Sequence, residues 1–98
     1  MEAQTHQFNL INSTYSAESA KEVLTSLIND KIRFLNIQIL SAHERFGENA
    51  THLEARVKEL EADRNRLIEI LGAAEKNNTE VEILSSVEFT IKETADLA

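Results

Sequence analysis

The chain has 98 residues, 42% of them apolar, with no Cys, Pro or Trp, and its 17 acidic and 10 basic residues give a formal net charge of −7. This length suits a single small domain, residues 1–98, with a thin core, and the lack of cysteine excludes disulfides and cysteine-ligated metal sites. The acidic balance opposes binding to nucleic acid or to anionic membranes, which relies on Lys and Arg. Because we see neither a signal-peptide pattern nor an apolar run of about 20 residues, we expect a cytoplasmic protein.

The chain begins with a polar segment that contains the first predicted strand. Phe8 and Leu10 would lie on one face of an extended segment, which predicts a short strand over residues 6–13. Ser16 is a good N-cap for the helix that follows, and Ser19 is a second candidate because Glu22 stands three residues after it, at capping-box spacing.

A long helix is predicted over residues 17–46, with no helix breaker before Gly47. One stripe of apolar residues repeats along it at spacings of four or three: Leu24, Ile28, Ile32, Leu35, Ile39, Ala42 and Phe46. Ile37 and Leu40 fall on nearly the opposite face, so the apolar arc covers about half of the circumference. Packing on one neighbour needs an arc of only about 100°, so this helix has apolar surface for a second neighbour.

A second helix is predicted over residues 50–76, after a turn at Glu48-Asn49 in which Asn49 would be the N-cap. Its seam follows heptad spacing, as in a coiled coil, and includes Leu53, Val57, Leu60, Arg64, Leu67, Leu71 and Ala74. A short connection between two long helices predicts an antiparallel hairpin.

Arg64 is the one charged residue in that seam. We expect it to pair with an acid such as Asp30 or Glu22, or to extend its charge to solvent. The alternative is a buried arginine that binds a ligand carboxylate or phosphate.

The last part of the chain changes to a period of two after Lys76-Asn77-Asn78, where an Asn can take the left-handed conformation that ends a helix. Apolar residues alternate with Glu, Ser and Thr, which predicts one long strand over residues 79–92. Glu80, Glu82 and Glu88 would share one face. They either protect an edge strand from aggregation or form a docking edge for a basic segment.

Together these elements predict an α+β, mainly α fold in the order β-α-α-β, with a long antiparallel helical hairpin and two flanking strands, packed as a dimer. The spare apolar arc of the first helix, the long last strand and the thin core all favour a homodimer or a higher homo-oligomer. The sequence leaves open whether the last strand pairs within its own chain or across the dimer. The residues predicted for the self-interface are Ile32, Phe34, Ile37, Leu40, Val87 and Phe89.

The sequence contains few residues in patterns that indicate catalysis or metal binding. His43 and His52 flank the turn, with Glu44 and Glu48 nearby, but two solvated histidines are a better interpretation than a metal site. Acidic residues recur along the second helix, at Glu54, Glu59, Glu61, Asp63 and Glu69, interleaved with basic ones, as on an ordinary solvated helix face. We therefore predict no catalytic residues, no cofactor and no metal.

Three functional hypotheses follow. The first is a small non-enzymatic scaffold or interaction protein that self-associates through its first helix and its last strand. The second is an acidic adaptor, antitoxin-like or chaperone-like, that masks a basic protein partner. The third is a dimer with a small-ligand cavity between its subunits, lined by Arg33, Asn36 or Arg64.

Overall fold

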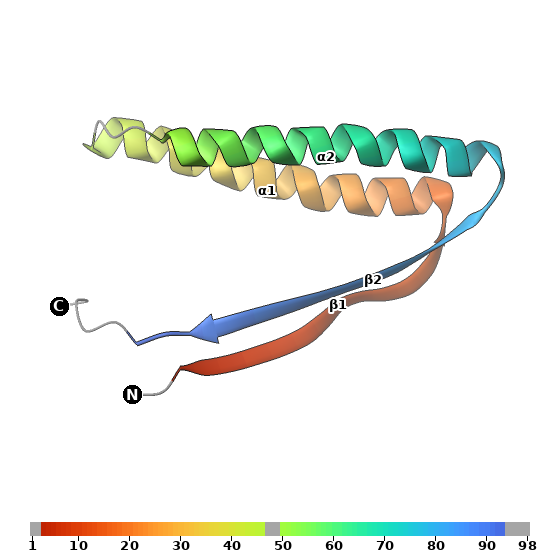
Figure 1. Cartoon of the computed structure of the whole chain (residues 1–98), viewed down its shortest axis with the longest axis horizontal. Helices are drawn as coiled ribbons and strands as arrows, with labels where there is room; N and C mark the ends of the chain where they lie inside the picture. The colour runs from red at the N-terminus through yellow and green to blue at the C-terminus, as the bar shows by residue number, and fades with distance from the viewer. Residues whose placement is uncertain (1–2, 47–49, 94–98) are drawn as a thin grey trace. The chain divides into compact units, whose positions relative to one another are not determined.

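The computed structural model describes residues 3–46 and 50–93. The elements follow in the order β1 (Gln4–Ser16), α1 (Ala17–Phe46), α2 (Thr51–Lys76) and β2 (Glu80–Ile91), as Figure 1 shows. The predicted β-α-α-β order and the mainly helical character are therefore confirmed. The chain divides into two compact units, a helical unit of Tyr15–Val81 and a ribbon unit of Met1–Thr14 with Glu82–Ala98, and the single domain stays a prediction.

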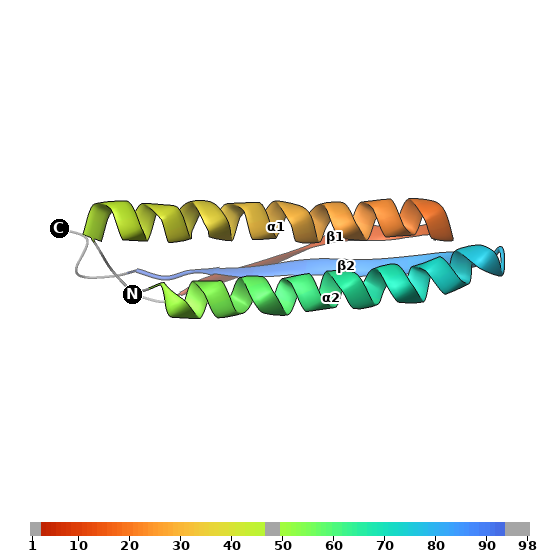
Figure 2. The ribbon, with the colours of Figure 1, turned by 90° about the horizontal axis from the view of Figure 1, so that it is seen from above.

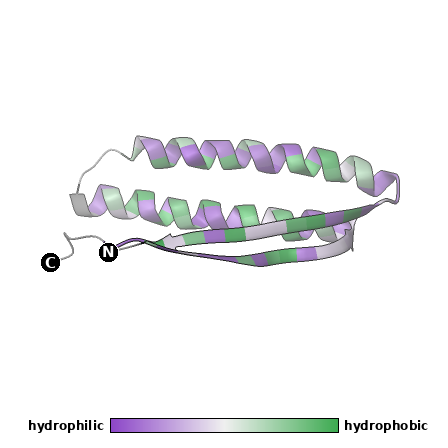
Figure 3. Cartoon of the chain, turned by 60° about the horizontal axis from the view of Figure 1, so that its bottom comes forward, coloured by the Kyte–Doolittle hydropathy of each residue, from purple (hydrophilic) through white to green (hydrophobic). Residues whose placement is uncertain are grey.

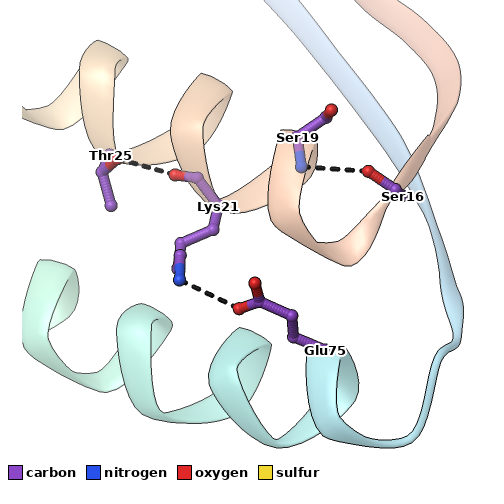
Figure 4. A network of polar contacts seen from close by, with 5 residues as sticks. All are labelled: Ser16, Ser19, Lys21, Thr25 and Glu75. Carbon is purple, nitrogen blue, oxygen red and sulfur yellow. Dashed lines mark hydrogen bonds and ion pairs between the residues drawn. The ribbon is translucent and has the colours of Figure 1, made fainter.

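The start of α1 is fixed by Ser16. The backbone N–H of Ser19 donates a hydrogen bond of 3.1 Å to the Ser16 hydroxyl oxygen (Figure 4). This bond satisfies one of the backbone donors that a helix leaves unpaired in its first turn. Ser16 is thus the N-cap, and the alternative cap, Ser19, lies inside the helix.

The end of α2 is set by Asn78, which takes a positive φ of 53°. The Asn78 N–H bonds the Glu75 carbonyl at 3.2 Å, and the Thr79 N–H bonds the Ala74 carbonyl at 3.3 Å. This pair of bonds is the Schellman arrangement, in which a residue in the left-handed conformation closes the helix. The predicted Asn cap is confirmed. At the other end of α2, the predicted stop at Gly47, the turn and the Asn49 cap lie outside the described residues.

The helical unit is an antiparallel hairpin with a narrow apolar seam. Figure 2 shows α1 and α2 running side by side in opposite directions. Near one end the Lys21 ammonium lies 3.0 Å from a Glu75 carboxylate oxygen (Figure 4), and near the other His43 Nε2 lies 3.9 Å from a Glu54 oxygen. The seam between them contains Ile32, Leu35, Val57 and Leu60, flanked by Ile28, Ile39 and Leu53. Among the described residues no large side chain is fully buried, because two helices cannot enclose a side chain on every side.

The ribbon is a two-stranded antiparallel sheet of β1 and β2. The hydroxyls of Thr5 and Thr90 lie 3.0 Å apart, and the rings of His6 and Phe89 stack with centroids 5.3 Å apart. The last strand therefore pairs within its own chain, which the sequence left open. Its bounds differ from the prediction by one residue at each end.

The first strand is longer than predicted, 4–16 rather than 6–13. The added residues are mostly polar and show no alternation of apolar and polar side chains, so periodicity could not detect them. Pairing with β2, which is itself long, extends β1 in both directions, because backbone hydrogen bonds do not depend on the side chain.

Candidate interaction surfaces

The first candidate surface is an apolar patch on α1 that points away from the hairpin seam. We define the outer patch as Leu27, Phe34, Ile37 and Leu40. In the single chain, Phe34 is 54% exposed, Ile37 60% and Leu40 59%. The last three follow one another at spacings of three residues, so they lie on adjoining parts of the helix surface. The Lys31 ammonium lies 5.3 Å from the centre of the Phe34 ring and borders the patch with a positive charge.

The surroundings of this patch differ sharply from the outer face of α2. Residues 34–42 of α1 contain no charged side chain, although 28% of the whole chain is charged. Residues 54–64 of α2, by contrast, carry seven charged side chains. A helix with one buried face is expected to be charged on its other faces, as α2 is over residues 54–64. Between Phe34 and Ala42, α1 therefore lacks the charged side chains that are expected on an outer face.

The second candidate surface is one face of the ribbon. Strand alternation and the His6–Phe89 pairing place Phe8 and Leu10 of β1 on the same face as Val87 and Phe89 of β2. Phe8, Leu10 and Phe89 are exposed in the single chain, and Val87 is half-buried. Figure 3 shows the apolar segments as green bands along both strands. Two strands with an apolar face are marginal in water without a further covering layer.

The structure distributes the six predicted self-interface residues over three environments. Ile32 is buried in the hairpin seam, where it packs within its own chain. Phe34, Ile37 and Leu40 lie in the exposed outer patch, while Val87 and Phe89 lie on the apolar face of the ribbon. Whether these residues meet a second chain stays a prediction.

Arg64 has a different partner from the acids predicted for it. Its Nη1 donates a hydrogen bond of 2.5 Å to Oδ1 of Asn29, and the residue is half-buried. The neighbouring Asp30 instead pairs with Arg33, one turn along the same helix, at 3.1 Å. The prediction missed Asn29 because it considered charged partners, whereas a neutral amide oxygen also accepts from a guanidinium.

Among the described residues, those considered for a metal site do not form a cluster, and the ligand cavity between subunits stays a prediction. His43 is exposed and faces Glu54 rather than forming a cluster, and Glu48 lies outside the described residues. Within residues 3–46 and 50–93, no group of three or more His, Asp or Glu side chains is placed to hold a metal ion. For the cavity, Asn36 is exposed, and Arg33 and Arg64 make the bonds described above.

The acidic side chains predicted to lie on the outer faces of α2 and β2 are exposed. All five acids predicted for the outer face of the second helix are exposed, and Glu59 lies 3.7 Å from Arg56 of the preceding turn. Glu80, Glu82 and Glu88 are likewise exposed on β2.

The structure also exposes Ile68 and Ile70 on α2, which sequence reasoning missed because they lie outside the heptad seam.

Comparison with models of protein families, with characterised proteins and with solved structures finds no match for this chain. Neither α1 nor α2 has a stretch long and apolar enough to cross a lipid bilayer.

Proposed function

We propose that this protein is a small non-enzymatic scaffold that acts as a homodimer, with the outer patch of α1 at the contact between its subunits. The observation that carries the proposal is the exposed outer patch, which lies in a stretch of α1, residues 34–42, without a charged side chain. The apolar face of the ribbon, with Val87 and Phe89, supplies further surface for the same association.

The hydrophobic effect favours covering the outer patch. Burying a Leu, Ile or Phe side chain is worth about 1.5–3 kcal/mol relative to leaving it in water. Contiguous exposed apolar surface on a small protein is typical of an interaction site. Covering the three most exposed members of the patch, each 54–60% exposed, therefore contributes free energy in favour of association.

Charge favours a second copy of this chain as the occupant. Each chain carries −7, so two copies repel one another wherever their acidic faces meet. The exposed side chains of Phe34, Ile37 and Leu40 lie in a stretch without carboxylates, so two copies can pack on them without bringing carboxylates together. A two-fold dimer uses one patch on both subunits, so a single self-complementary surface is sufficient.

The test is the mass in solution, measured by light scattering after size exclusion over a series of concentrations. We expect twice the mass of the chain for the natural protein. Ile37→Asp should weaken the dimer by about 3 kcal/mol, roughly a hundredfold in Kd, because it places a charge in the centre of the contact.

The matched control is Ala62→Asp, which adds the same charge at an exposed position of α2 and should leave the dimer intact. Circular dichroism separates a folded monomer from an unfolded chain. If Ile37→Asp unfolds, the milder Ile37→Ser takes its place. A natural protein that stays monomeric at every concentration, or an Ile37 variant that dimerises as tightly as the natural chain, would contradict the proposal.

A second candidate function is the acidic adaptor, favoured by the row of exposed glutamates on β2. A basic protein partner would be held by charge, so its binding would weaken steeply as salt rises. Isolation of such a complex from a chain that is otherwise monomeric would place this function first.

A further inference from the structure

We propose that the second copy joins the ribbon through the free edge of β1, so that two β1 strands pair antiparallel and form a four-stranded sheet. This inference rests on the proposed self-association and names a second surface for it, apart from the outer patch of α1.

The ribbon has two edges to choose between. In a sheet of two strands, each strand uses one edge for its partner and leaves the backbone N–H and C=O groups of the other edge unpaired. The described residues supply no third strand to either edge. Such edges attract further strands unless charge, proline or a bulge protects them.

Charge distinguishes the two edges. Residues 3–17, which include all of β1, contain no Asp, Glu, Lys or Arg, and β1 contains no proline or glycine. Strand β2 carries Glu80, Glu82 and Glu88, all exposed. Pairing two copies of β2 would put both sets of carboxylates on one face of neighbouring strands, where like charges repel one another. Pairing two copies of β1 meets no such repulsion.

The apolar face also sets the register of this pairing. A two-fold axis perpendicular to the sheet keeps the apolar faces of both ribbons on the same side. Each even-numbered residue of β1 then lies opposite an even-numbered residue of the other β1 strand, and each odd-numbered residue lies opposite an odd-numbered one. If the axis passes through Asn9, Phe8 of each subunit lies opposite Leu10 of the partner subunit. This register sets apolar residues opposite one another on both sides of the axis, in the middle of the strand.

The test uses the absence of cysteine from the natural chain. Residues directly opposite in an antiparallel pair have Cα atoms about 4.5–5.5 Å apart, within the range of a disulfide. In Asn9→Cys the two thiols face one another at the axis. We expect mild oxidation to convert most of this variant to a covalent dimer.

The matched control is Ser86→Cys. The Thr5–Thr90 and His6–Phe89 pairings place Ser86 opposite Asn9 on the neighbouring strand of the same ribbon, so it tests the β2 edge at the same level. It should stay uncrosslinked. If Asn9→Cys does not fold, a mixture of Gln7→Cys and Ile11→Cys chains serves instead, because these positions face one another in the same register. The mixture should yield mainly the mixed dimer.

Light scattering on the same samples separates this inference from the proposed function. If the protein is a dimer but Ser86→Cys crosslinks, the β1 pairing is overturned and the dimer stands. The same conclusion follows if the protein is a dimer but neither Asn9→Cys nor the mixture crosslinks. A monomer in every sample would overturn both.

Discussion

Single residues set the ends of the two helices. Ser16 supplies a side-chain acceptor for the Ser19 N–H at the start of α1, and Asn78 supplies the left-handed residue that closes α2. Both roles depend on local chemistry alone: a hydroxyl that reaches a backbone donor, and a side chain that tolerates positive φ. Ser16 therefore marks the junction between β1 and α1, and Asn78 lies at the junction between α2 and β2.

The role of Asn78 predicts a contrast between two substitutions. Asn78→Ala should lower the free energy of unfolding by about 1 kcal/mol, because an Ala Cβ is strained at positive φ. Asn78→Gly should leave it unchanged or raise it slightly, since glycine adopts this conformation readily. Urea unfolding at a fixed protein concentration measures both changes.

Asn77 provides the control for this pair. It is the neighbouring residue of the same type, but its φ is −91°, which any residue adopts. Asn77→Ala should therefore change stability by much less than Asn78→Ala. Equal losses at the two positions would mean that lost side-chain contacts, and not backbone strain, explain the effect.

At the scale of the element, the hairpin depends on a narrow seam that Arg64 interrupts. Its neighbours in the core, Val57 and Leu60, are buried, whereas Arg64 is half-buried and bonds the exposed Asn29. A hydrogen bond contributes about 0.5–1.5 kcal/mol in net terms, and this one lies near the low end because water competes for the exposed Asn29. Apolar contact along the seam would contribute more.

We therefore expect Arg64→Leu to keep the fold and raise the thermal midpoint. A gain of about 1 kcal/mol corresponds to a rise in Tm of roughly 4–8 °C for a domain of this size. Thermal unfolding by circular dichroism measures it, at one protein concentration for all variants. Asn29→Ala is the control and should shift Tm little, because Asn29 is exposed. A large fall in Tm for Arg64→Leu would show that the guanidinium has a buried partner.

At the scale of the whole molecule, exposed apolar surface and net negative charge have opposite effects on association. The outer patch of α1 and the apolar face of the ribbon both favour association. The net charge of −7 on each chain opposes it. Because the side chains at the proposed contacts are uncharged, added salt should screen the repulsion between the chains and leave the hydrophobic attraction between them unchanged.

This balance predicts a dimer that tightens as sodium chloride rises. Between about 0.05 and 0.5 M salt, screening of the repulsion should lower Kd by at least about threefold. Sedimentation equilibrium over a series of concentrations gives Kd directly. Weakening with salt would instead mean that ion pairs hold the subunits together, and the acidic faces would then belong to the contact.

The order of the elements, the bounds of α1 and, within one residue, the bounds of α2 and β2 could all be predicted from local sequence patterns. Periods of 3.6 and 2 come from local backbone geometry, and the caps at Ser16 and Asn78 come from local side-chain chemistry, so both can be recognised without a fold. The spare apolar arc of the first helix was also visible as pattern.

The residues that contact one another across the chain could not be predicted in this way. The bond from Arg64 to Asn29, the added ends of β1 and the pairing of β2 within its own chain each join residues far apart in the sequence. Several partners satisfied the local pattern equally well, as Asp30 and Asn29 did for Arg64. The choice depends on which side chains packing brings into reach, and that follows from the register of the hairpin and of the ribbon.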